Sequence, residues 1–122
     1  MARIFIADDD RDYLEAFRMG LESIGHTVFQ VDSGDKVIEI VENSDFDIIF
    51  LDVVMAGGGA ISLVHPIRTR RPDTPVVVMT GHAELYNSAV FTQGFRLANA
   101  RIKKSASLDE IKALVTNLLY AR

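Results

Sequence analysis

Aspartates follow two apolar stretches of the sequence, and their spacing suits the binding of a divalent cation. The acidic run Asp8–Asp10 comes directly after the short apolar stretch 3–7, and Asp52 comes directly after the bulky apolar residues 48–51. Four such residues in a row are typical of a strand that is covered on both faces, in the middle of a parallel sheet. A carboxylate at the carboxyl end of such a strand lies in the crevice where open α/β sheets bind ligands. Asp52 is therefore the first candidate functional residue.

The strand ends should bring Asp8, Asp9 and Asp52 together. Carboxylates that converge repel one another, and each is pushed toward its neutral form unless a cation joins them. Mg²⁺ prefers oxygen ligands, commonly one or two carboxylates, several waters and a substrate phosphate. The chain has no cysteine and its three histidines are scattered, which disfavours a zinc site. The alternative is that Asp8–Asp10 only cap a helix and that Asp52 is a solvated strand end.

Two further side chains are expected at the ends of neighbouring strands. Thr80 closes the apolar run 76–79 with a hydroxyl, and Lys103 or Lys104 follows the fifth strand with an ammonium. Each, taken singly, is more often an ordinary surface residue. Together with a metal they would form a pocket for a dianion, in which the Asp52 carboxylate attacks phosphorus while the cations and the hydroxyl neutralise the phosphoryl oxygens.

The elements that must position these residues alternate between strand and helix. The expected strands are 3–7, 27–31, 47–52, 76–80 and 101–103, and the expected helices are 14–24, 37–43, 61–67, 83–93 and 108–119. Five such units predict an α/β fold, a doubly wound parallel sheet with helices on both faces. The flavodoxin-like strand order 2-1-3-4-5 fits best, and it places the ligand crevice between the first and third strands. We expect one domain over residues 1–122.

Single residues refine this outline. Pro66 lacks a backbone donor, so it predicts either a kink or a third helix whose regular part begins late. Ser107 and Glu110 have the spacing of a capping box at the start of the last helix. The glycines 57–59 predict a loop, since three adjacent glycines have too much backbone freedom for a helix interior.

Composition and charge exclude several classes of function. The net charge of -4 and the pI near 5.3 provide no overall attraction for nucleic acid. The cations Arg68, Arg70 and Arg71 are better explained as offsetting a helix dipole. No apolar run approaches the roughly 18 residues that span a bilayer, and the first residues lack the apolar core of a secretory signal. We therefore expect a cytoplasmic protein that binds neither membranes nor nucleic acid directly.

The motifs in this order and spacing resemble a response-regulator receiver domain of two-component signalling, and the resemblance covers the whole chain. The segments that carry it are Ile-Ala-Asp8-Asp9-Asp10, Ile-Ile-Phe-Leu-Asp52-Val-Val-Met55, Val-Val-Val-Met-Thr80-Gly81 and Lys103-Lys104-Ser-Ala-Ser-Leu-Asp-Glu. The resemblance implies that this domain is not an enzyme but a phosphoprotein switch. Its phosphoryl donor would be a histidine kinase or a phosphotransfer protein, and its downstream protein partner is unknown.

The resemblance also implies a role for each site residue. Asp52 matches the phosphoacceptor, Asp9 a direct Mg²⁺ ligand, and Asp8 an acid that holds metal-bound water. Val54 would contribute its backbone carbonyl to the metal. Thr80 matches the switch hydroxyl and Lys104 the lysine that pairs with the phosphoryl group, although Lys103 is only one register away.

This chain also departs from the family pattern. Ala56 replaces a proline, Ala60 replaces a glycine, Ser105 replaces the proline after the lysine, and Arg101 stands where an aromatic switch residue is expected. These departures motivate an alternative, a receiver-like interaction module that works without phosphate. An aspartyl phosphatase of the haloacid-dehalogenase type is disfavoured, because it needs a second aspartate where this chain has Val54. Val54 and His82 occupy positions that influence the lifetime of the acyl phosphate in the family, and valine cannot orient a hydrolytic water.

Overall fold

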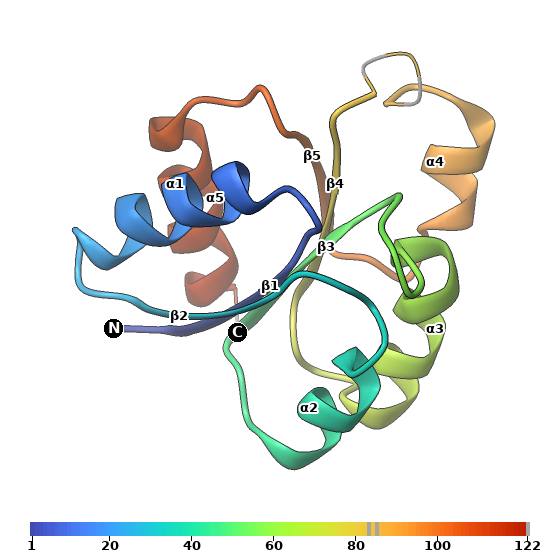
Figure 1. Cartoon of the computed structure of the whole chain (residues 1–122), viewed down its shortest axis with the longest axis horizontal. Coiled ribbons are helices and arrows are strands. Elements are labelled where there is room, and N and C mark those ends of the chain that lie inside the picture. Colours follow the sequence, from blue (N-terminus) through green and yellow to red (C-terminus); the bar gives the residue numbers. More distant parts are fainter. Residues whose placement is uncertain (83, 85, 122) are drawn as a thin grey trace.

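The computed structural model describes residues 1–82, 84 and 86–121, and in these residues strands and helices alternate along the chain (Figure 1). The strands are β1 (Arg3–Ala7), β2 (Thr27–Val31), β3 (Ile48–Asp52), β4 (Val76–Thr80) and β5 (Ala100–Lys103). The helices are α1 (Arg11–Glu22), α2 (Val37–Asn43), α3 (Ala60–Arg70), α4 (Ala89–Gly94) and α5 (Leu108–Tyr120).

All strand pairs are parallel, and the strand order is β2-β1-β3-β4-β5, as the sequence predicts. The register aligns the strand ends. Ala7 is paired with Leu51, so the next residues, Asp8 and Asp52, are level with each other. Thr80 is paired with Lys103 at the same edge. The sheet therefore gathers the polar residues that follow β1, β3, β4 and β5 along one edge.

Two layers of apolar side chains hold the helices on the sheet. Helices α1 and α5 cover one face, and α2, α3 and α4 cover the other (Figure 1). Alternate residues of β3 enter the two layers: Ile48 and Phe50 pack toward α1 and α5, while Ile49 and Leu51 pack toward the other helices. This arrangement explains why β3 is a continuous apolar run, since a strand that is buried on both faces has no polar side.

Three helices differ from the expected boundaries. Helix α1 spans Arg11–Glu22 rather than residues 14–24. Helix α3 begins at Ala60 and runs through Pro66 to Arg70, so its regular part does not begin late. Helix α4 begins at Ala89, where the Ser88 hydroxyl accepts a hydrogen bond from the Phe91 amide and caps the helix. Within the described residues, α4 therefore begins later than the predicted helix 83–93. The first residue of the predicted helix, Ala83, lies outside the described residues, as does residue 85.

The last helix forms as predicted. The Ser107 hydroxyl accepts a hydrogen bond of 3.2 Å from the Glu110 amide, which satisfies one free donor of the first turn. Ile111 and Val115 are buried against the α1 side of the sheet, and Leu114, Leu118 and Leu119 pack partly buried beside them.

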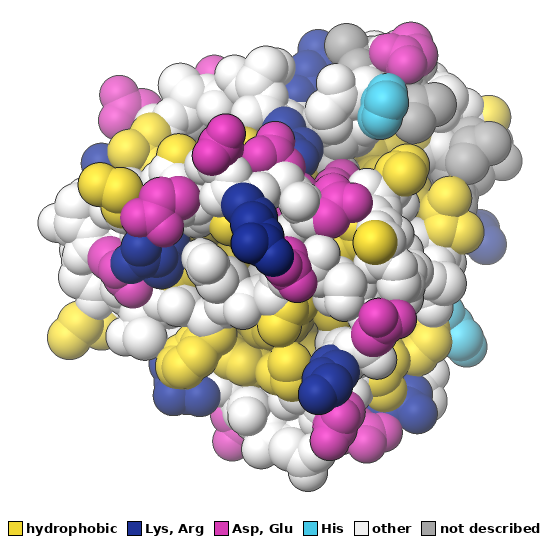
Figure 2. All heavy atoms as spheres, viewed as in Figure 1, with side chains coloured by type: hydrophobic (Ala, Val, Ile, Leu, Met, Phe, Trp, Pro, Cys, Tyr) yellow, Lys and Arg dark blue, Asp and Glu magenta, His cyan; other side chains and the backbone are white. Residues whose placement is uncertain are grey.

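None of the helices in the described part of the chain is long and apolar enough to cross a membrane. Acidic and basic side chains lie interspersed over the face drawn in Figure 2.

Candidate functional site

Three carboxylates meet at the carboxyl edge of the sheet. Asp8, Asp9 and Asp52 each offer a carboxylate oxygen, and these oxygens all lie within 4.8 Å of one another. Asp8 is fully buried and Asp52 is 6% exposed, while Asp9 is open to solvent. The turn after β1 is held by Asp8 itself, whose Oδ1 accepts a hydrogen bond of 2.9 Å from the Asp10 amide. The sequence therefore places two buried acids and one exposed acid at a single point.

The negative charge of this cluster is not fully balanced by the protein. Burial, and next the charge of Asp8, raise the pKa of Asp52 from 3.8 to about 7, although Lys104 and the Val54 amide act in the opposite direction. Oδ2 of Asp8 accepts no hydrogen bond from the described residues, although the Lys104 ammonium lies 2.8 Å away. Buried carboxylate oxygens with spare lone pairs are suitable ligands for a hard divalent cation. The residues present thus fit a site for such a cation.

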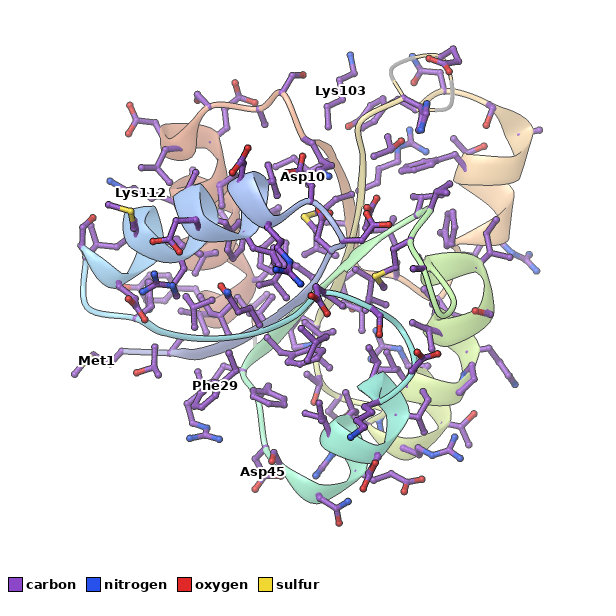
Figure 3. All side chains as sticks on the ribbon, in the orientation of Figure 1. Met1, Asp10, Phe29, Asp45, Lys103 and Lys112 are labelled. Atoms are coloured by element: carbon purple, nitrogen blue, oxygen red, sulfur yellow. The ribbon has the colours of Figure 1, made fainter. Side chains whose placement is uncertain are left out.

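Lys104 is the cation that the protein itself supplies. Its Nζ lies 3.0 Å from Oδ1 and 2.8 Å from Oδ2 of Asp8, and 3.7 Å from Oδ2 of Asp52. Burial alone would lower the pKa of Lys104, but the hydrogen bond and charge of Asp8 and the charge of Asp52 outweigh it and raise that pKa. The ammonium therefore stays charged. Lys103, by contrast, is exposed and points outward from the end of β5 (Figure 3).

Thr80 lies at the end of β4 with its side chain buried. Its hydroxyl accepts a hydrogen bond of 2.9 Å from the His82 amide, and its carbonyl accepts one of 2.8 Å from the Lys104 amide. The loops after β4 and β5 are thus joined through one residue. In this structure the hydroxyl is engaged with the loop after β4.

The loop after β3 closes over the exposed acid. The Ala56 amide donates a hydrogen bond of 3.2 Å to Asp9 Oδ2, and the Ala56 carbonyl accepts one of 2.8 Å from the Gly34 amide. Gly57 and Gly58 adopt positive φ angles of 78° and 109°. A Cβ at Gly34 would lie 1.9 Å from the Gly58 carbonyl oxygen, so glycine is required where the two loops meet. Val54 is 58% exposed beside the acids.

Tyr13 is a neighbour of the site that the sequence did not single out. The Lys104 Nζ lies 4.7 Å from the centroid of its ring, and its hydroxyl lies 3.9 Å from the Met79 sulfur. Burial, followed by the charges of Asp8, Asp52 and Asp10, raises the pKa of Tyr13 to about 12, so the phenol stays neutral. Its position in the first turn of α1, directly after the acidic run, is the signal that could have identified it.

Arg101 occupies the place where an aromatic residue was expected. Its side chain packs on aromatic rings from other parts of the chain. Its guanidinium carbon lies 5.0 Å from the ring centroid of Tyr86 and 6.0 Å from that of Phe91. The Tyr86 hydroxyl donates to the Arg101 carbonyl at 3.5 Å. Tyr86 also has the Lys103 Nζ 5.0 Å from its ring, so two cations flank this tyrosine.

A doubly wound parallel sheet with acids at the ends of β1 and β3 defines an α/β protein with an acidic crevice that could hold a cation. The family is more specific: the chain belongs to the response regulator receiver domain family, whose sequence profile matches residues 4–116. The fold class and the family predicted from the sequence are therefore confirmed.

Similar proteins agree with this assignment. The DNA-binding transcriptional regulator NtrC of Escherichia coli K12 is 30% identical over 114 residues, which make up 92% of this chain and 24% of NtrC. The chain therefore spans about a quarter of the length of that relative.

Solved structures share the fold. The response regulator TrrA of Thermotoga maritima, determined in complex with Mg²⁺-BeF, has a TM-score of 0.85 at 24% identity, covering 98% of this chain and all of TrrA. A response regulator of Burkholderia pseudomallei, determined with a phosphorylated aspartic acid and a calcium ion, has a TM-score of 0.82 at 24% identity, covering 99% of this chain and 71% of that chain. At these identities the likeness concerns the fold.

Proposed function

We propose that this chain is a phosphoacceptor switch in which Asp52 receives a phosphoryl group in a Mg²⁺-dependent reaction. The observation that carries the proposal is the meeting of Asp8, Asp9 and Asp52 with the Lys104 ammonium at one strand edge. The Mg²⁺-BeF complex of TrrA and the phosphorylated aspartic acid of the Burkholderia protein support this reading by analogy of fold.

Asp52, Lys104 and Thr80 have separate roles in this phosphoryl transfer. An Asp52 oxygen attacks phosphorus and forms the new O–P bond, while the P–N bond of a phosphohistidine donor breaks and the imidazole takes up a proton. Lys104 balances charge on the transferring phosphoryl oxygens from its place beside Asp8. Thr80 is the hydroxyl that would leave the His82 amide and turn to the phosphoryl group.

A divalent cation, when bound, supplies the charge neutralisation that keeps Asp52 ionised and nucleophilic. Asp9, Asp52 and the Val54 carbonyl would hold it directly, and Asp8 would hold it through water. Burial raises the pKa of Asp52 to about 7, and a bound cation would favour the ionised form of this carboxyl, which is the nucleophilic form.

The wider setting belongs to the same proposal. The chain is one receiver domain over residues 1–122, it works in the cytoplasm, and it acts as a regulatory domain rather than as an enzyme. A histidine kinase or phosphotransfer protein donates the phosphoryl group, and a protein partner responds to the altered surface.

Arg101 favours one alternative function. Its stacking on Tyr86 and Phe91 fills the place of the aromatic switch residue with a cation that is already packed. A receiver domain that binds its partner through this face without phosphate would need no movement there.

Intact mass distinguishes the two functions. The wild-type chain and Asp52→Asn are incubated with acetyl phosphate, with and without Mg²⁺, and a second series uses a histidine kinase. A gain of one phosphoryl group that needs both Mg²⁺ and Asp52 supports the switch. A folded wild-type chain that gains nothing from either donor supports the phosphate-independent module.

A further inference from the structure

The lysine of the site is held from two sides. Its ammonium meets Asp8 at 2.8 Å on one side and the face of the Tyr13 ring, with 4.7 Å to the centroid, on the other. Lysine is a point charge on a flexible four-carbon stem, so a single ion pair leaves it considerable freedom. A ring face in a largely desolvated place attracts the ammonium through its quadrupole. Two contacts, with Asp8 and with the Tyr13 ring, therefore fix the position of the Lys104 ammonium.

The Tyr13 ring is itself fixed by the core. It lies 6.2 Å from the Phe17 ring, centroid to centroid, and Phe17 packs edge-on against Phe50 of β3 at 4.9 Å. Its hydroxyl touches the Met79 sulfur of β4 at 3.9 Å, a weak contact. The ring position thus depends on α1, β3 and β4, and two of these elements carry site residues, Asp52 on β3 and Thr80 on β4.

We propose that Tyr13 is a positioning residue that keeps the Lys104 ammonium beside Asp8 and Asp52. The ring face has this role and the hydroxyl does not, because among the described residues the hydroxyl makes only the weak contact to sulfur. The consequence for phosphoryl transfer rests on the proposed function, since it takes Lys104 as the cation that balances the phosphoryl oxygens. The contact between the two side chains does not depend on that function.

The test compares two variants. Tyr13→Phe keeps the aromatic ring, whereas Tyr13→Leu keeps an apolar side chain but removes the ring. Leu21→Val is the matched control, because Leu21 is fully buried in the same apolar layer and lies about two helical turns from Tyr13. Circular dichroism and thermal unfolding first establish that each variant is folded.

The first readout needs no phosphate. The proton shifts of the Lys104 ε-methylene, assigned by their loss in Lys104→Arg, report the ring beneath the ammonium. Wild type, Tyr13→Phe and Leu21→Val should share an upfield shift that disappears in Tyr13→Leu. Equal shifts in all four proteins would overturn the positioning role.

The second readout is the rate at which acetyl phosphate and Mg²⁺ phosphorylate Asp52. Tyr13→Leu should be slower by about 3- to 10-fold, in line with the strength of partly desolvated cation–π contacts, and Tyr13→Phe should remain within about 2-fold of wild type. A Tyr13→Phe variant as slow as Tyr13→Leu, or a Leu21→Val variant equally slow, would overturn the proposal. If wild type is not phosphorylated at all, the proposed function fails and the proton shifts alone decide the role of Tyr13.

Discussion

Asp52 is the residue whose ionisation is most costly to the metal-free fold. Its pKa is raised from 3.8 to about 7, mainly by burial and then by Asp8, so the folded state binds this proton more tightly than the unfolded state. Between about pH 4 and pH 7 the folded chain therefore loses stability as the pH rises, and above pH 7 the loss is complete. The carboxylate that we propose as the nucleophile thus opposes folding when no cation is bound.

The first prediction concerns Asp52→Asn, which keeps the shape of the side chain and removes its charge. Without divalent cations the variant should be more stable than wild type at pH 8, by on the order of 1–3 kcal/mol, because one pKa unit corresponds to about 1.4 kcal/mol. At pH 4 the difference should nearly vanish. Urea unfolding in a chelating buffer at both pH values measures it, and a variant less stable than wild type at pH 8 would contradict the charge argument.

The second prediction concerns Asp9, the exposed member of the cluster. A cation that binds only the folded state stabilises it, so on the proposed function Mg²⁺ should raise the stability of the wild-type chain by about 1.4 kcal/mol for each tenfold increase above its dissociation constant. Asp9→Asn should lose most of this stabilisation. Asp12→Asn is the matched control, since Asp12 is an acid in the first turn of α1 outside the cluster.

Thermal unfolding against MgCl₂ at constant ionic strength tests the second prediction. Equal gains in the Asp9 and Asp12 variants would show that the effect is general screening of charge rather than a bound ion.

At the scale of elements, the apolar runs predicted the strands because each buried strand needs a continuous or alternating apolar pattern. The start of α4 was predicted wrongly, because its apolar pattern is thin and the Ser88 cap, not the pattern, determines where the helix begins. The sequence alone did not settle the choice between Lys103 and Lys104. In the structure Lys103 pairs with Thr80 at the end of β5, and the next residue, Lys104, points into the site. Tyr13 and Tyr86 were missed because their contacts join segments far apart in sequence.

The hydrogen bonds of Arg68 were not predicted from the sequence. Arg68 was interpreted as one of three cations that offset a helix dipole, but its guanidinium instead bonds the ends of several elements together. It donates to the carbonyls of Leu97, Arg71, Pro72 and Thr74 and to Asn99 Oδ1. Asn99 Oδ1 also accepts from the Val76 amide at the start of β4. The carboxyl end of α3 and the segment before β5 are therefore joined through one side chain.

The third prediction follows from this geometry. Arg68→Lys should lower the free energy of unfolding by about 1–3 kcal/mol, since an ammonium has three donors and lacks the planar fork that reaches acceptors on opposite sides. Arg70→Lys is the control, because Arg70 makes an exposed ion pair with Glu42 and should change little. Urea unfolding compares the two. A loss of similar size in both variants would indicate that charge geometry at α3, not the carbonyl network, is responsible.

At the scale of the whole molecule, one sheet joins two apolar layers that do not touch each other. Ile67 of α3 is fully buried in the layer shared with α2 and α4, and Val115 of α5 is fully buried in the layer shared with α1. Because the strands contribute alternate residues to both layers, we expect the two layers to unfold together. The site lies at the sheet edge, where both layers end.

The fourth prediction tests this joint dependence. Ile67→Val should cost about 0.5–1.5 kcal/mol and Val115→Ala about 1–3 kcal/mol of the free energy of unfolding, and the double variant should show their sum within about 0.5 kcal/mol, because distant sites with no shared contacts act additively. Far-ultraviolet dichroism and the methyl resonances of each layer should report the same midpoint in urea, as expected for one cooperative unit. The stabilisation by Mg²⁺ should persist in both single variants, since neither residue belongs to the acidic cluster. Separate midpoints for the two layers would mean that the acidic edge can lose one supporting layer while the other remains folded.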